Sequence, residues 1–159
     1  MPRIGITGHT NLTQAAVALV TAAVRAELAK QAPLFGVTCL AQGADRIFAH
    51  VVLDLGGRLD VVLPSADYRE RQVPAPEVEE FDALLDRAST VHTMPFPRSG
   101  PAAYMAASEH MLGRVDSLVA VWDGEPSGGY GGTADVVNAA RHRGLPVTVL
   151  WPAGAARTP

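Results

Sequence analysis

The stretch that decides the fold is DSLVAVWDGEPSGGYGGTADVVNAARHRG, residues 116–144. It opens with an apolar, β-branched run that is typical of a buried strand. From Thr133 onward it has the apolar spacing of a helix. Between the two parts, residues 127–132 carry four glycines in six positions. A strand, a glycine-rich connection and a helix in this order predict one unit of a parallel α/β sheet.

The same alternation runs through the rest of the chain. Six strands and five helices in β-α order predict a doubly wound, mainly parallel six-stranded sheet with helices on both faces, which is a Rossmann-like fold. The polar, proline-bearing residues 65–76 are expected to form a loop. Strands are expected at residues 3–8, 36–43, 58–64, 89–95, 116–124 and 145–152, and helices at residues 12–31, 44–57, 77–88, 101–115 and 133–144.

The length of 159 residues fits a single domain. We expect this domain to cover residues 1–152 and residues 153–159 to form a flexible tail. Thr13 is expected to cap the first helix. The apolar face of that helix, AVALVTAAV, suits either the core or a homodimer interface.

Composition limits the classes of partner. The net charge is -3 and the basic residues form no run, so nucleic acid is not an expected partner. No apolar run approaches the length of about 20 residues that a membrane span needs, so no membrane partner is expected. Cys39 is the only cysteine, which suits a reducing compartment. We therefore expect a cytoplasmic protein, and the spacing of the five histidines predicts no metal site.

The glycine-rich stretch is the first candidate for a binding site. In doubly wound sheets, ligands bind beyond the carboxyl ends of the strands, where the strand order reverses. Gly129, Gly131 and Gly132 let the backbone approach a ligand closely, and a helix that begins at Thr133 presents unpaired amides and a partial positive charge. This combination predicts a site for phosphate or another anion. Asp135 is interpreted either as a contact to a sugar hydroxyl or as a favourable charge at the helix start.

Two other connections are expected at the same edge of the sheet. Thr7, Gly8 and His9 end the first strand, and Gly8 permits a tight turn beneath a ligand. His9 is interpreted as a phosphate donor, an acid or base, or a cap of the following helix. Gly43 and Asp45 open the second helix, where Asp45 either stabilises the helix or contacts ribose or a metal.

The expected loop at residues 65–76 offers weaker candidates. Arg69 and Arg71 could fold over a phosphate, but solvated charges are the favoured interpretation. Tyr68 suits stacking on a base or packing on the core equally well.

The chain resembles the SLOG superfamily, a Rossmann-like group that includes the LOG-type proteins and the DNA-processing Smf proteins. The resemblance covers residues 3–151 and rests on four segments, which are GITGHT, AQGAD, DSLVAVWDG and GGYGGTADVV. It implies binding of a nucleotide or a nucleotide-derived ligand at the glycine-rich helix start. Some LOG-type members hydrolyse the N-glycosidic bond of nucleoside monophosphates, and members are often dimers.

The chain departs from the LOG-type pattern where the hydrolysis would take place. Val136 stands at the position of the family's glutamate, and Asp135 falls one residue earlier, which turns it by about 100° around the helix. Ala107 stands at the position of the family's arginine. We therefore expect a sensor, carrier or regulatory module that binds an AMP-, ADP- or ATP-like ligand, rather than an enzyme. The alternative is an N-glycosidic hydrolase with a shifted set of acid–base groups, namely His9, Asp45 and Asp135.

Overall fold

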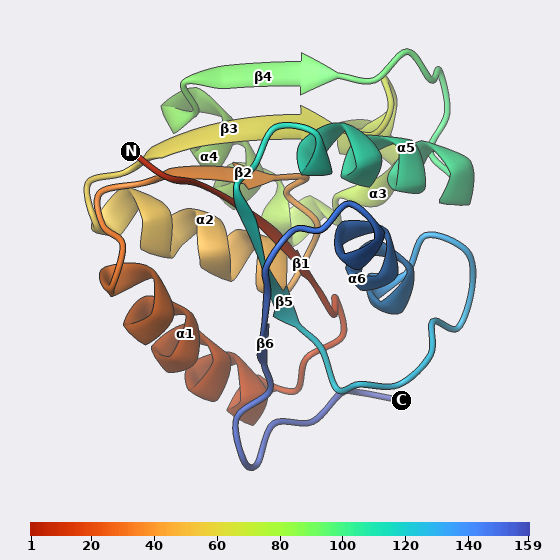
Figure 1. Cartoon of the computed structure of the whole chain (residues 1–159). Helices are drawn as coiled ribbons and strands as arrows, with labels where there is room; N and C mark the ends of the chain where they lie inside the picture. The colour runs from red at the N-terminus through yellow and green to blue at the C-terminus, as the bar shows by residue number, and fades with distance from the viewer.

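The computed structural model describes residues 1–159, and its six strands form one sheet in which every neighbouring pair is parallel (Figure 1). The spatial order is β4-β3-β2-β1-β5-β6, so the connections leave the central β1–β5 pair in opposite directions. The predicted doubly wound, Rossmann-like sheet is confirmed, and all of it is parallel. The strands are β1 (Arg3–Gly8), β2 (Phe35–Thr38), β3 (Arg58–Leu63), β4 (Thr90–Thr93), β5 (Ser117–Val121) and β6 (Val147–Leu150).

Helices cover both faces of the sheet (Figure 1). One face packs against α1, α2 and α4 in a core that includes Phe48, Phe81 and Ile6. The other face packs against α5 and α6 around Met111 and Val136. The helices are α1 (Gln14–Ala29), α2 (Ala44–Asp54), α3 (Tyr68–Gln72), α4 (Val78–Arg87), α5 (Pro101–Leu112) and α6 (Thr133–His142).

The expected start of α1 is confirmed, because the Thr13 hydroxyl accepts a hydrogen bond from the amide of Ala16 at 3.1 Å. Ala16, Val20 and Val24 of this helix lie in the core, while Val17 and Leu19 remain exposed on its outer side. A homodimer through this side stays a prediction. No helix in the chain combines the length and the apolar character that crossing a membrane requires.

The region expected to be one loop, residues 65–76, contains the short helix α3 and a 3-10 turn, Ala75–Glu77. The prediction of an unstructured loop was therefore wrong. Tyr68 anchors α3 by packing into the main core, against the ring of Phe81. Five residues are too few to produce a readable helical period, so tertiary packing rather than local pattern determines this element.

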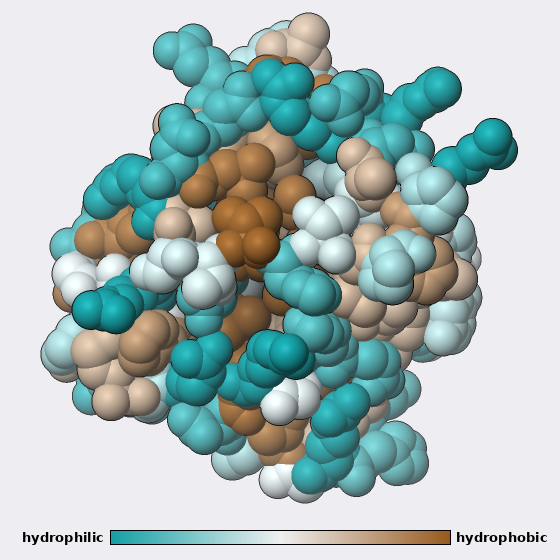
Figure 2. All heavy atoms as spheres, turned by 90° about the horizontal axis from the view of Figure 1, so that it is seen from above, coloured by the Kyte–Doolittle hydropathy of each residue, from teal (hydrophilic) through white to brown (hydrophobic).

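The edge of the sheet at β4 is open. All four residues of β4 are exposed, and Val91 is 48% exposed. Seen from this side, the surface shows apolar residues surrounded by hydrophilic ones (Figure 2).

The C-terminal segment runs back beside the residues that follow β1. Arg157 forms an antiparallel bridge with Leu12, and the Thr13 amide donates to the Ala156 carbonyl at 3.0 Å. Asn11 and Thr158 are joined by three further hydrogen bonds, of 2.7, 2.8 and 3.2 Å. Residues 156–158 are therefore paired with the body of the domain, and the flexibility expected for residues 153–159 stays a prediction.

Candidate functional site

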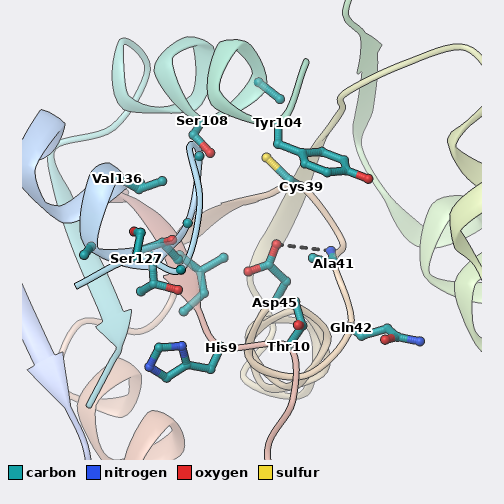
Figure 3. A pocket seen from close by; sticks show the side chains of 18 of the residues that line it. His9, Thr10, Cys39, Ala41, Gln42, Asp45, Tyr104, Ser108, Ser127 and Val136 are labelled. Atoms are coloured by element: carbon teal, nitrogen blue, oxygen red, sulfur yellow. Dashed lines mark hydrogen bonds between the residues drawn. The ribbon is translucent and has the colours of Figure 1, made fainter. Parts of the chain in front are cut away.

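A cavity of about 420 Å³ lies beyond the carboxyl ends of β1 and β5, where the strand order reverses. Residues from the connections after β1, β2, β3 and β5 line it, together with one side of α5 and the start of α6 (Figure 3). Of the ten residues expected to bind a ligand, six line the cavity: Thr7, His9, Asp45, Gly131, Gly132 and Thr133. The other four, Gly8, Gly43, Gly129 and Asp135, lie outside the lining.

Gly8 and Gly43 lie outside the cavity lining, where they allow neighbouring elements to pack closely. A Cβ atom on Gly8 would lie 2.5 Å from the Cβ of Ala44 and 2.8 Å from that of Val121. Gly43 has a φ of +73°, and a Cβ there would lie 2.5 Å from the His9 carbonyl oxygen. These glycines therefore allow β1, β5 and the start of α2 to pack closely.

The loop before α6 is held by two side chains, Ser127 in the loop and Asp135 in the first turn of α6. The carboxylate of Asp135 accepts a hydrogen bond from the Gly131 amide at 2.9 Å, and the amide of Asp135 donates to the Ser127 hydroxyl at 3.2 Å. Gly131 has a φ of +87°, a conformation that favours glycine. Asp135 is thus turned toward the loop, where it fixes the loop's closure on the helix.

The first turn of α6 leaves backbone donors available to the cavity. The amides of Thr133 and Ala134 donate to no group of the protein, and both residues line the cavity. Such donors cannot be satisfied within their own helix, because the first turn has no preceding carbonyls. Together with the positive end of the helix dipole, they form an arrangement that suits a phosphate or carboxylate group.

His9 lines the cavity and is hydrogen-bonded to Asp123, the second residue after β5. The side chain of His9 is 7% exposed, and Nε2 lies 3.1 Å from both the amide nitrogen and a carboxylate oxygen of Asp123. Burial lowers the pKa of His9, and Arg157 lowers it further, against the opposing effect of Asp123. The neutral ring accepts the Asp123 amide hydrogen through Nε2, which ties the end of β1 to the end of β5. The ring of Trp151 packs edge-on against the His9 ring, with the two ring centroids 5.5 Å apart.

Asp45 is the buried carboxyl group of the cavity wall, with 6% of its surface exposed. One of its oxygens accepts the Ala41 amide at 3.1 Å. Burial raises the pKa of Asp45 to about 7, although hydrogen bonding from Ala41 and the charge of Arg46 oppose the shift. In Figure 3 it projects from the start of α2 into the middle of the cavity, with Tyr104 and Cys39 on one side and His9 on the other. Its position is compatible with both of the roles expected for it.

Several lining residues were not expected. Tyr104 and Ser108 come from α5, Ser127 from the loop before α6, and Arg157 from the C-terminal segment. Tyr68 packs in the core as one interpretation expected, and it also lines the cavity, so its stacking on a base stays a prediction. Arg69 lies elsewhere and forms a two-pronged ion pair with Asp82, with both bonds at 2.8 Å. Only a three-dimensional arrangement could reveal the residues on α5 and at the C-terminus, because no local spacing distinguishes them.

No protein-family model matches the chain, and no curated protein matches it in sequence. Solved structures do match it. DNA processing protein A (DprA) from Streptococcus pneumoniae superposes with a TM-score of 0.70 over 97% of this chain and 52% of its own, at 15% identity. DprA from Helicobacter pylori gives a TM-score of 0.68 over 98% of this chain and 68% of its own, at 17% identity.

The Moco carrier protein from Chlamydomonas rheinhardtii gives a TM-score of 0.57 over 93% of this chain and 74% of its own, at 16% identity. The chain therefore shares the fold of the matching domains of these proteins. The Rossmann-like fold that the resemblance implies is therefore confirmed. The chain spans about half the length of the Streptococcus pneumoniae protein.

Proposed function

We propose that the chain binds a nucleotide, or another nucleotide-derived phosphate compound, as a sensor, carrier or regulatory module. The observation that carries this proposal is the pair of unpartnered amides of Thr133 and Ala134, two residues that line a cavity at the switch point of the sheet. A phosphate group at this place would accept both hydrogen bonds and lie at the positive end of α6. A volume of about 420 Å³ falls within the range of small-molecule sites.

The two sides of the cavity differ in chemistry, which orients the ligand. Figure 3 places Ser127 on one side and Tyr104 and Gln42 on the other. The side of Ser127 carries the hydroxyl and amide donors that suit phosphate. The opposite side offers the ring of Tyr104 for stacking on a nucleobase. Asp45 lies between them, where its carboxyl group would meet the ribose hydroxyls.

One of the matching structures suggests a nucleic-acid strand as an alternative ligand with the same chemical groups. The Helicobacter pylori protein binds single-stranded DNA, which also carries phosphate and nucleobases. Two observations favour a small ligand for this chain. The net charge is -3, and Arg157 is the sole arginine or lysine among the cavity residues. Strand-binding grooves instead carry several cations along the backbone path.

The proposal can be tested with Thr133→Pro. Proline is accepted at the first position of a helix, and Gly132 before it already has an extended conformation, with φ -74° and ψ 177°. The substitution removes one amide hydrogen from the site while α6 can still form. Thr133→Ala is the matched control, because it keeps the amide and removes the hydroxyl.

The measurement is isothermal titration of the wild type and both variants with AMP, ADP, ATP, NAD, ADP-ribose and a short single-stranded oligonucleotide. We expect saturable binding of at least one phosphate compound, weakened about tenfold or more by Thr133→Pro and much less by Thr133→Ala. A wild type that binds none of these compounds would refute the proposal. Tight binding of the oligonucleotide alone would replace the small ligand with a nucleic-acid strand.

One observation favours a second candidate function, the hydrolysis of an N-glycosidic bond. A carboxyl group whose pKa is raised to about 7 is suited to proton transfer near neutral pH, and Asp45 is such a group inside the cavity. The other two expected acid–base groups do not join it, since Asp135 binds the Gly131 amide and Nε2 of His9 faces Asp123. Release of adenine from AMP, or of nicotinamide from NAD, with loss in Asp45→Asn would establish this function.

A further inference from the structure

Arg157 gives the cavity its single permanent positive charge. Among the side chains that line the cavity, it is the one arginine, and there is no lysine. It reaches the site from the C-terminal segment, which pairs with the residues just after β1. The other ionisable side chains of the lining, apart from Arg157, are Asp45, Glu125, His9, Cys39, Tyr68 and Tyr104. Without Arg157, none of the groups that carry charge near pH 7 would attract an anion.

The protein holds the guanidinium group of Arg157 in place but leaves some of its N–H donors without a partner. Its Nε atom donates to the side-chain oxygen of Asn11 at 2.9 Å, and Nη1 donates to Asp123 at a longer 3.3 Å. Nη2 makes no hydrogen bond with the protein, and the side chain is 38% exposed. One edge of the group is therefore fixed by Asn11, while donors on the rest of the planar fork are available to a ligand.

Asp123 does not depend on Arg157 for its partners. Its carboxylate also accepts the Glu125 amide at 3.0 Å and lies beside His9. A ligand phosphate that drew Nη1 away would leave this carboxylate with another hydrogen bond. The exchange is chemically favourable, because an arginine binds phosphate through two parallel, charge-assisted hydrogen bonds.

We propose that Arg157 recognises the anionic group of the ligand together with the amides at the start of α6. The C-terminal segment is then part of the binding site, and its pairing with Asn11–Thr13 serves to present this one cation. The inference rests on the proposed function, since it assigns a specificity-determining residue to the same cavity.

The test compares the binding of ADP and of adenosine by titration calorimetry in the full chain. Arg157→Gln removes the charge, and Arg157→Lys keeps the charge without the planar fork. Arg58→Gln is the matched control, since it makes the same change of net charge at the start of β3, where Arg58 stacks on Phe35 and forms no ion pair. Thr158→Ala removes a hydrogen bond of the C-terminal segment, of 3.2 Å to the Asn11 carbonyl, and keeps the guanidinium.

We expect Arg157→Gln to weaken ADP binding about 10- to 100-fold, which is the scale of a lost hydrogen bond to a charged group. Adenosine binding should change less than about twofold, because adenosine has no phosphate. Arg157→Lys should fall between the wild type and Arg157→Gln, and Arg58→Gln and Thr158→Ala should bind ADP like the wild type.

The outcomes separate the two proposals. If the wild type binds ADP and Arg157→Gln binds it with about the same affinity, the role of Arg157 is refuted and the proposed function stands. Equal losses for ADP and adenosine would also refute it, because they would show that Arg157 only supports the fold of the site. If the wild type binds no phosphate compound, both proposals fail.

Discussion

Replacing Asp45 by asparagine is expected to remove a large part of the pH dependence of stability. The pKa of Asp45 is raised from 3.8 to about 7 in the folded protein, chiefly by burial. Between these values the unfolded chain releases its proton and the folded chain keeps it. The free energy of unfolding must therefore decrease as pH rises through this range. The amide side chain introduced by Asp45→Asn would stay neutral at every pH, and its oxygen could still accept the hydrogen bond from the Ala41 amide.

The size of the effect follows from linkage. With pKa values of 3.8 and about 7, and about 1.4 kcal/mol per pKa unit, the wild type loses about 2.5 kcal/mol from this group between pH 5 and pH 8. The assay is urea unfolding followed by circular dichroism at pH 5, 6, 7 and 8. Asp54→Asn is the control, because it makes the same change of charge at an exposed position of the same helix. Parallel pH profiles for the wild type and Asp45→Asn would refute the reasoning.

Three further outcomes are expected. Gly8→Ala should lower the free energy of unfolding by about 1–3 kcal/mol through overpacking against Ala44 and Val121. Gly100→Ala is the control in the same urea titration and should change this free energy far less, because a Cβ there would meet nothing within 4 Å. The pKa of His9 is lowered from 6.5, so its contribution to stability is present above about pH 6.5 and is lost as pH falls through its folded pKa. His9→Gln should therefore make the free energy of unfolding depend less on pH in this acidic range. An unchanged pH dependence there would contradict the assignment. Ser127→Ala removes the acceptor for the amide of Asp135, so it should weaken ADP binding in calorimetry by several-fold; full affinity would show that the loop does not need this bond.

The architecture could be predicted because local and global signals agree. Most buried strands are short, mainly apolar runs, the helices α2, α4 and α6 show an apolar face at helical spacing, and α1 has a cap at Thr13. The signal failed at α3, where five residues carry no period and the packing of Tyr68 determines the structure. Element boundaries were less accurate than element types, as for β2, which ends at Thr38 rather than near Gly43.

The candidate site could be predicted only in part. The glycine-rich loop was found because a strand, several glycines and a helix start are adjacent in sequence. Gly8 and Gly43 were predicted to contact a ligand but lie outside the cavity lining, because a glycine after a strand is equally necessary where two elements pack closely. Arg157 could not be found, since its partner Asn11 is 146 residues away and the pairing of the C-terminal segment has no sequence signature.

The most direct test of anion binding at the start of α6 is the ¹⁵N–¹H spectrum of the protein titrated with ADP. The donors that the structure leaves without a protein partner are the amides of Thr133 and Ala134. The account predicts that these two amides show the largest saturable shifts, and that adenosine leaves them nearly unchanged. Saturable binding of ADP without a shift of the Thr133 and Ala134 amide resonances would contradict the account.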